Sequence, residues 1–123
     1  MKTIIIIRTD NKIEELNINI KIKNILSILE KNSTNKGNGK IKLVDSVKNI
    51  KFYGWTSGHT VNKHILPNKK VKLYGDLFVL NINRNILNYT IAEYGELHYL
   101  LTSKDNENEN SDNILLDYDT NEY

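Results

Sequence analysis

Cysteine is absent from this chain of 123 residues. Without cysteine there can be no disulfide bond, and zinc sites that depend on thiolate ligands are excluded as well. Small secreted domains commonly rely on disulfides for their stability. The absence therefore favours an intracellular protein that folds on its hydrophobic core alone.

Long apolar runs are also missing. The isoleucine run at 4–7 ends at Arg8, so it is too short for the ~7–15-residue core of a signal peptide. No segment approaches the ~20 consecutive apolar residues that a membrane-spanning helix needs. We therefore expect a protein that is not secreted and has no membrane partner.

Arginine occurs only at positions 8 and 84, so lysine supplies most of the positive charge. Residues 1–100 carry 16 Lys and Arg against 8 Asp and Glu, a net charge of +8. Residues 101–123 carry one Lys against 7 Asp and Glu, a net charge of −6. A basic body followed by an acidic tail suggests nucleic-acid binding that the tail restrains, although lysines that alternate with apolar residues also suit the solvated face of a sheet.

Two periodic patterns open the chain. Residues 2–8 form a β-branched run typical of a strand buried on both faces, and residues 13–20 alternate between apolar and polar side chains. Together they predict an N-terminal hairpin. Apolar residues then recur at helical spacing and predict a short amphipathic helix; they are Ile22, Ile25, Leu26 and Leu29.

The remaining body alternates strands and loops. A capping-box pattern at Thr90 and Glu93 predicts a second short helix. We expect an α+β fold over residues 1–102, with a small mixed or antiparallel sheet, one or two short helices and a β-grasp-like strand order. Residues 103–123 predict a disordered acidic tail. Further strands are expected at 41–44, 47–53 and 77–82, with an ordered loop at 54–66.

Catalytic constellations are not evident. His59 and His64 are five residues apart in the predicted loop, which is not helical metal-ligand spacing, and ordinary loop histidines explain them. Ser57 lies near His59, but no glycine pattern or orienting group forms a nucleophile elbow. We therefore expect a non-enzymatic protein with no cofactor and no metal.

The segment 52–64 brings together Phe52, Tyr53 and the sole tryptophan, Trp55. Its aromatic side chains suit a protein interface, where Trp and Tyr are enriched, or stacking on single-stranded bases. Alternatively, they only pin a loop to the core. The leading hypothesis is an adaptor that binds another protein, with weak nucleic-acid binding as the alternative. The candidate partner-binding residues are Tyr53, Trp55, His59, Asn62, Lys63, His64 and Tyr74.

A resemblance rests on this same region. The residues that carry it are Tyr53-Gly54, Gly58, the run 62–67 that ends at Pro67, and Leu73-Tyr74-Gly75-Asp76. They resemble a group of small uncharacterised proteins of giant DNA viruses, of the mimivirus and large algal-virus kind. The resemblance implies a viral protein located in the host-cell cytoplasm or the virion, and it implies no chemistry.

Overall fold

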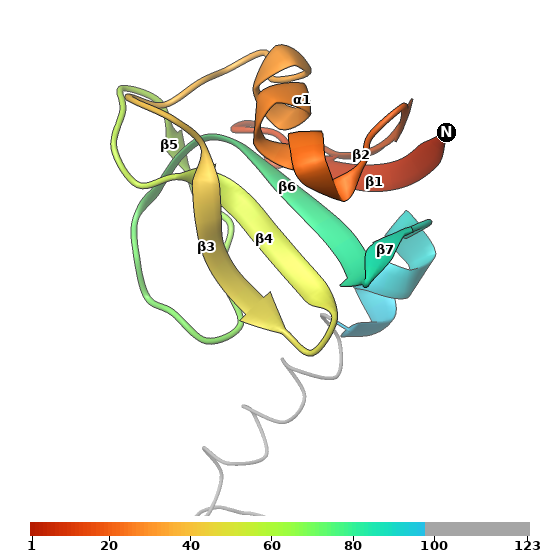
Figure 1. Ribbon diagram of the computed structural model, residues 1–123. Helices are drawn as coiled ribbons and strands as arrows, with labels where there is room; N and C mark the ends of the chain where they lie inside the picture. Colours follow the sequence, from red (N-terminus) through yellow and green to blue (C-terminus); the bar gives the residue numbers. More distant parts are fainter. Residues whose placement is uncertain (98–123) are drawn as a thin grey trace, which may run out of the picture. The chain divides into compact units, whose positions relative to one another are not determined.

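The computed structural model describes residues 1–97, and the chain divides into two compact units, Met1–Ile91 and Ala92–Tyr123 (Figure 1). Residues 91–97 are helical, as the capping-box pattern predicts. The expected domain end at residue 102 and the acidic tail at 103–123 lie outside the described residues.

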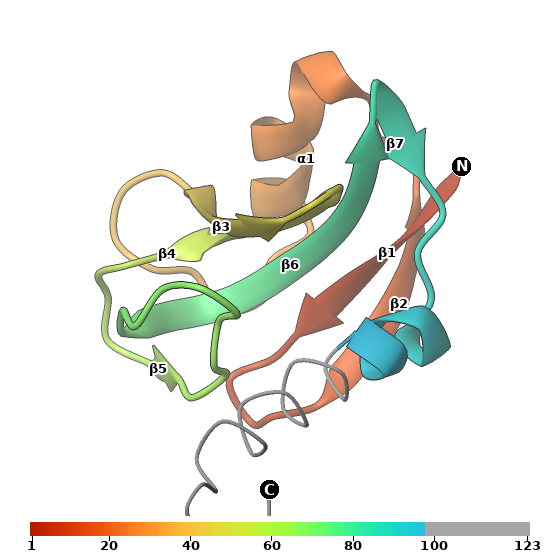
Figure 2. The same ribbon diagram turned by 90° about the horizontal axis from the view of Figure 1, so that it is seen from below.

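A seven-stranded sheet makes up most of the first unit. Its main path runs in the order β2-β1-β6-β4-β3, and β5 and β7 also pair with β6 (Figure 2). Every strand pair in residues 1–97 is antiparallel. The strands are β1 (Lys2–Ile7), β2 (Ile13–Ile18), β3 (Lys42–Val47), β4 (Ile50–Trp55), β5 (Val61–Asn62), β6 (Leu73–Asn83) and β7 (Asn85–Leu87).

Strand β6 is the spine of the sheet. β1 pairs with its middle, where Ile6 lies opposite Phe78, and β4 pairs along its other edge. A tight turn at Arg84, whose φ is 66°, joins β6 to β7. Strand β6 pairs directly with β1, β4, β5 and β7 and so sets their relative positions. The two outer strands, β2 and β3, pair with β1 and β4 instead.

One helical segment covers a face of the sheet (Figure 1). It begins as a 3-10 turn, η1 (Ile22–Asn24), and continues as α1 (Ile25–Lys31). The Asn24 side chain accepts the backbone N–H of Lys21 at 2.9 Å, which supports the start of the segment. Ile25 and Leu29 are buried, but Ile22 and Leu26 are 45% and 46% exposed. Only half of the predicted apolar face therefore packs on the sheet.

The core lies between α1 and the sheet. The buried cluster comprises Ile4, Ile6, Ile20, Ile25, Leu29, Ile41, Trp55, Phe78, Leu80 and Ile86. Side chains alternate along a strand, so Ile5, Ile7, Leu77 and Val79 point to the opposite face, and all four are also buried. This confirms the prediction that the first strand is buried on both faces.

The expected α+β class is confirmed, with an antiparallel sheet and short helices. The β-grasp-like arrangement stays a prediction. The strand bounds expected around residue 45 were wrong, because β3 continues through Asp45 and the chain turns at Lys48, whose φ is 54°. The expected loop at 54–66 includes the end of β4 and all of β5, and β7 was not expected.

Candidate functional site

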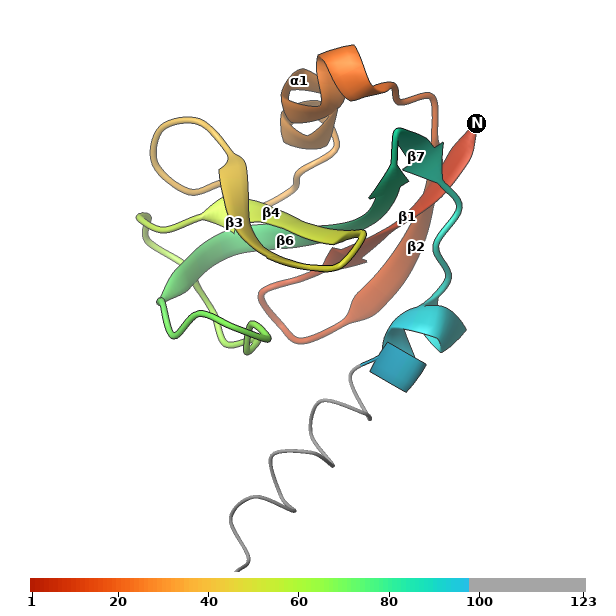
Figure 3. The ribbon, with the colours of Figure 1, turned by 60° about the horizontal axis from the view of Figure 1, so that its bottom comes forward.

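The connection between β5 and β6, residues 63–72, is the most basic stretch of the described chain. We call it the lysine loop, because it contains Lys63, Lys69, Lys70 and Lys72 and no acidic residue. All four lysines are exposed. They line a groove of about 480 Å³ whose walls also include His64, Ile65 and Val71. The loop and α1 lie on opposite faces of the sheet (Figure 3).

Asn62 holds the start of the lysine loop in place. Its side chain is 2% exposed and donates to the carbonyls of Ile7 and Gly75, at 3.0 and 2.9 Å. Its Oδ1 accepts the backbone N–H of His64 at 3.0 Å. The amide thus links the loop to β1 and β6 at once, and its buried polar atoms are all satisfied.

Asp45 on β3 holds the middle of the lysine loop. Its Oδ2 accepts the backbone N–H groups of Asn68 and Lys69, at 2.8 and 3.2 Å. The Asn68 side chain donates in turn to the carbonyl of Ser46 at 2.7 Å. Hydrogen bonds to an ionised carboxylate are stronger than neutral ones. Asp45 is only 5% exposed, so this carboxylate anchors the loop to the sheet edge without neutralising lysine ammonium groups.

The lysine side chains of the loop are not paired with acidic side chains of the described residues. Within residues 1–97, none of the four loop lysines forms an ion pair. The ion pairs of this part of the chain join Arg8 to Glu14 and Asp76, and Lys12 to Asp10. Glu15 and Glu30 accept backbone N–H groups elsewhere in the first unit. Four lysine ammonium groups therefore remain available to an anionic ligand.

Apolar side chains accompany these lysines at the surface. Ile65 is 77% exposed and Val71 is 44% exposed. Leu66, between Ile65 and Pro67, is buried instead and ties this part of the loop to the protein. A ligand in the groove would meet cationic groups and two aliphatic side chains together.

The structure separates the predicted partner-binding residues. Lys63 and His64 line the lysine-loop groove, and His59 lies in an exposed turn. Tyr53 and Tyr74 are partly buried and pack against the core cluster on the α1 side. No groove described in residues 1–97 contains both tyrosines together with Lys63.

Trp55 and Asn62 require a correction, because both are buried. Trp55 is 1% exposed, and its indole Nε1 donates to the carbonyl of Gly39 at 3.1 Å. This hydrogen bond holds the 32–40 loop against the core. Asn62 positions the lysine loop from beneath. Neither side chain is placed to touch a partner directly.

Asp76 forms a second polar centre that the sequence did not single out. It is fully buried, and its Oδ2 accepts the backbone N–H groups of Thr34 and Asn35, at 2.8 and 3.1 Å. Arg8 Nη1 lies 3.3 Å from the same oxygen. These contacts fasten the 32–40 loop across the start of β6. The Ser33 hydroxyl also donates to this oxygen at 3.3 Å, so Asp76 joins the 32–40 loop, Arg8 and β6 in one set of hydrogen bonds.

Sequence reasoning also missed Lys69, Lys70, Lys72 and Asp45 as members of the site. The three lysines follow Pro67 closely, but in the sequence their spacing is also typical of the solvent-exposed face of a strand. Asp45 falls between the strands expected at 41–44 and 47–53, where the sequence indicated a turn. The signal that distinguishes the loop is the absence of acids from ten consecutive residues that carry four lysines.

Two kinds of site are absent from residues 1–97. No cluster of three or more His, Asp or Glu side chains is arranged to hold a metal ion. Among the helices of this part of the chain, none has the length and apolarity to cross a membrane.

Comparisons with protein-family models, with curated proteins and with solved structures find no match to this chain. The resemblance to giant-virus proteins therefore stays a prediction.

Proposed function

We propose that this chain is a non-enzymatic nucleic-acid-binding protein that contacts the phosphate backbone through the lysine loop. The observation that carries the proposal is the set of four exposed, unpaired lysines on a loop held by two buried polar side chains, Asn62 and Asp45. A preorganised loop loses less conformational freedom on binding than a mobile one. Phosphates are the natural counter-charge, because lysine neutralisation of phosphate releases condensed counterions.

The residue types indicate what kind of recognition to expect. The planar guanidinium of Arg and the amides of Asn and Gln suit bidentate contact with base edges, whereas the lysine ammonium is a compact point charge that suits phosphate. The groove is lined by lysines and contains no arginine. We therefore propose binding with little sequence preference, in which Ile65 and Val71 contact sugars or base faces.

The acidic segment 103–123 acts as a restraint in this proposal. Its carboxylates carry the charge that a phosphate backbone would bring, so they compete for the same lysines. Neutralising them in the full-length chain should strengthen binding. The substitutions are D105N, E107Q, E109Q, D112N, D117N and D119N.

The experiment is a fluorescence-anisotropy titration of a labelled oligothymidine of about 20 nucleotides, a length chosen to exceed common single-strand site sizes. If all four lysines contact phosphates, affinity falls roughly 50-fold between about 50 and 200 mM salt. The acid-neutralised chain should bind more tightly than the wild type at every salt concentration. If neither protein binds at low salt, the proposed function is wrong.

A second function, non-enzymatic binding of another protein, is favoured by a separate observation on the α1 side. Leu26 and Leu43 are 46% and 50% exposed beside the partly buried Tyr53, where they line one groove. Exposed apolar side chains that gather around an aromatic ring are typical of protein-interaction sites. This keeps the adaptor hypothesis while moving its contact surface away from Trp55.

A further inference from the structure

The groove beside α1 combines an apolar floor with a uniformly basic border. We call it the helix groove; it has a volume of about 530 Å³ and its lining includes Ile22, Leu26, Leu43, Tyr53, Lys23 and Lys42. Leu43 on β3 and Tyr53 on β4 are direct cross-strand partners, so they form one continuous surface. Ile22 and Leu26 supply the facing wall from η1 and α1.

The apolar side chains of the helix groove are more exposed than packing requires. Ile22, Leu26 and Leu43 are each 45–50% exposed, although they adjoin buried members of the core. Burial raises the pKa of the Tyr53 hydroxyl above its ordinary value of 10.0.

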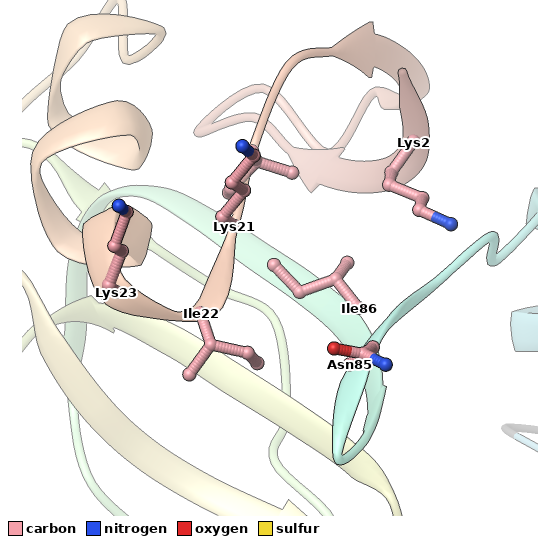
Figure 4. Close-up of a pocket in the computed structure, with 7 residues that line it drawn as sticks. Lys2, Lys21, Ile22, Lys23, Asn85 and Ile86 are labelled. Carbon is pink, nitrogen blue, oxygen red and sulfur yellow. The ribbon is translucent and has the colours of Figure 1, made fainter.

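The border of the helix groove carries charge of one sign. Lys23 and Lys42 line it, and no acidic residue does. A neighbouring groove of about 500 Å³ shares Ile22 and Lys23 and adds Lys2 and Lys21. Figure 4 shows these three lysines, Lys2, Lys21 and Lys23, in a row along one side of Ile22 and Ile86. None of the four lysines along the two grooves forms an ion pair within residues 1–97.

We propose that the helix groove binds an acidic, amphipathic segment of a protein partner, with large aliphatic or aromatic side chains on the floor and carboxylates on the lysine border. This rests on the protein-binding function proposed above and adds the chemistry of the partner. Charge complementarity selects an acidic segment, because every ionised side chain along the two grooves is a lysine. The exposed leucines and Tyr53 select apolar anchors, because buried apolar and aromatic contacts supply most interface energy.

A nucleic acid fits this groove less well than it fits the lysine loop. The floor consists of aliphatic side chains, which cannot form hydrogen bonds with the polar edges of bases. The one aromatic ring, Tyr53, is partly buried against the core and cannot present a whole face for stacking. The two surfaces lie on opposite sides of the sheet, so their ligands can be tested separately (Figure 3).

The test is selection of short random peptides displayed on phage against the immobilised full-length chain. Wild-type protein should enrich peptides that pair Asp or Glu with Leu, Ile or Phe. L26S/L43S should bind a selected synthetic peptide at least about tenfold more weakly, the loss expected when two interface anchors are removed. K23Q/K42Q should weaken binding and reduce its salt dependence.

A matched control uses I13S/L87S, which removes two exposed aliphatic side chains from β2 and β7, away from the helix groove. It should leave peptide affinity unchanged. If the selected peptides are not acidic but still depend on Leu26 and Leu43, the partner chemistry is wrong while protein binding stands. If no selected peptide depends on Leu26 and Leu43, both the inference and the protein-binding function are wrong.

Discussion

The carboxylate of Asp45 accepts the backbone N–H of Asn68 at 2.8 Å, across 23 residues of sequence. A buried acid on the edge strand thereby sets the shape of the loop that carries the exposed lysines. Asp45 adds a negative charge, which by itself would weaken anion binding. Its hydrogen bonds nevertheless hold the loop in the shape that presents the lysines, and this favours anion binding. Charge and geometry can therefore be separated by mutation.

Replacing Asp45 with alanine provides that separation. Asp45→Ala raises the net charge by one unit but removes the acceptor of the Asn68 and Lys69 N–H groups. We expect nucleic-acid affinity to fall, and the free energy of unfolding to drop by about 1–3 kcal/mol, because hydrogen bonds to a charged acceptor are lost. Oligonucleotide titration and urea denaturation measure the two effects.

Asp10→Ala is the matched control, because Asp10 is exposed and, within residues 1–97, contacts Lys12 through an ion pair at 3.9 Å and a backbone hydrogen bond at 3.1 Å. It removes the same charge without loosening the lysine loop, so affinity should stay equal or rise slightly. An affinity gain of equal size for Asp45→Ala and Asp10→Ala would contradict the anchoring role.

Two glycines with similar dihedral angles predict different sensitivities to substitution. Gly75 has φ of 67°, and a Cβ added there would lie 2.7 Å from the carbonyl oxygen of Asn35. Gly39 has φ of 73°, but an added Cβ would meet nothing within 4 Å. Gly39→Ala should cost about 1 kcal/mol of stability from left-handed strain alone, and Gly75→Ala distinctly more.

Chemical denaturation of the two variants measures this difference. Equal losses of stability would mean that the 32–40 loop does not pack against the start of β6 as described. Because Gly75 also lies beside Asp76, a large loss at Gly75 would support the buried hydrogen bonds between that acid and the loop.

Tyr53 predicts a dependence of stability on alkaline pH. Burial raises its pKa in the folded chain above 10.0, whereas in the unfolded chain the pKa stays near that value. Between these two values the folded state holds the proton more tightly. Its contribution to stability is therefore fully present below about pH 10 and is lost as pH rises through the folded pKa.

Ultraviolet absorbance of tyrosinate follows this ionisation directly. The wild-type titration should contain a delayed component above the range of exposed tyrosines, and Tyr53→Phe should reduce its amplitude by one tyrosine. If the Phe variant titrates with the same delayed component, another tyrosine is responsible.

The burial of Trp55 predicts that its fluorescence does not respond to nucleic acid, as it would if a base stacked on the indole ring. The indole is 1% exposed and hydrogen-bonded to Gly39, so its fluorescence should be nearly insensitive to a soluble quencher. Addition of oligonucleotide should leave the emission maximum unchanged, since the lysine loop lies on the other face of the sheet (Figure 3). Quenching on binding would place nucleic acid against Trp55 and overturn this assignment.

The sequence predicted those elements whose side-chain pattern follows directly from burial. The isoleucines at 4–7 and the alternation at 13–20 lead to the hairpin because a strand repeats every two residues. Asp45 misled the prediction, because a buried aspartate inside a strand looks like a turn until its partners at 68 and 69 are known. Those partners are distant in sequence, so local patterns carry no trace of them.

The site was predictable only in part, for the same reason. Lys63 and His64 were recognised, and they do line the groove. The aromatic content of segment 52–64 suggested Trp55 as a contact residue, but a sole tryptophan serves a core as readily as an interface. Its burial depends on Gly37, which lacks the side chain that would collide with the Trp55 ring. Such a long-range fit cannot be inferred from composition.

The most direct test of the central claim compares two full-length quadruple variants. K63Q/K69Q/K70Q/K72Q neutralises the lysine loop, and K31Q/K36Q/K40Q/K48Q removes the same charge from exposed lysines that line none of the described grooves. Anisotropy titrations with a labelled single strand at several salt concentrations should show that the loop variant loses a salt slope of about 3, whereas the control keeps its slope within about 1 unit of wild type. Equal losses in both variants would contradict the account, because binding would then follow net charge rather than the lysine loop.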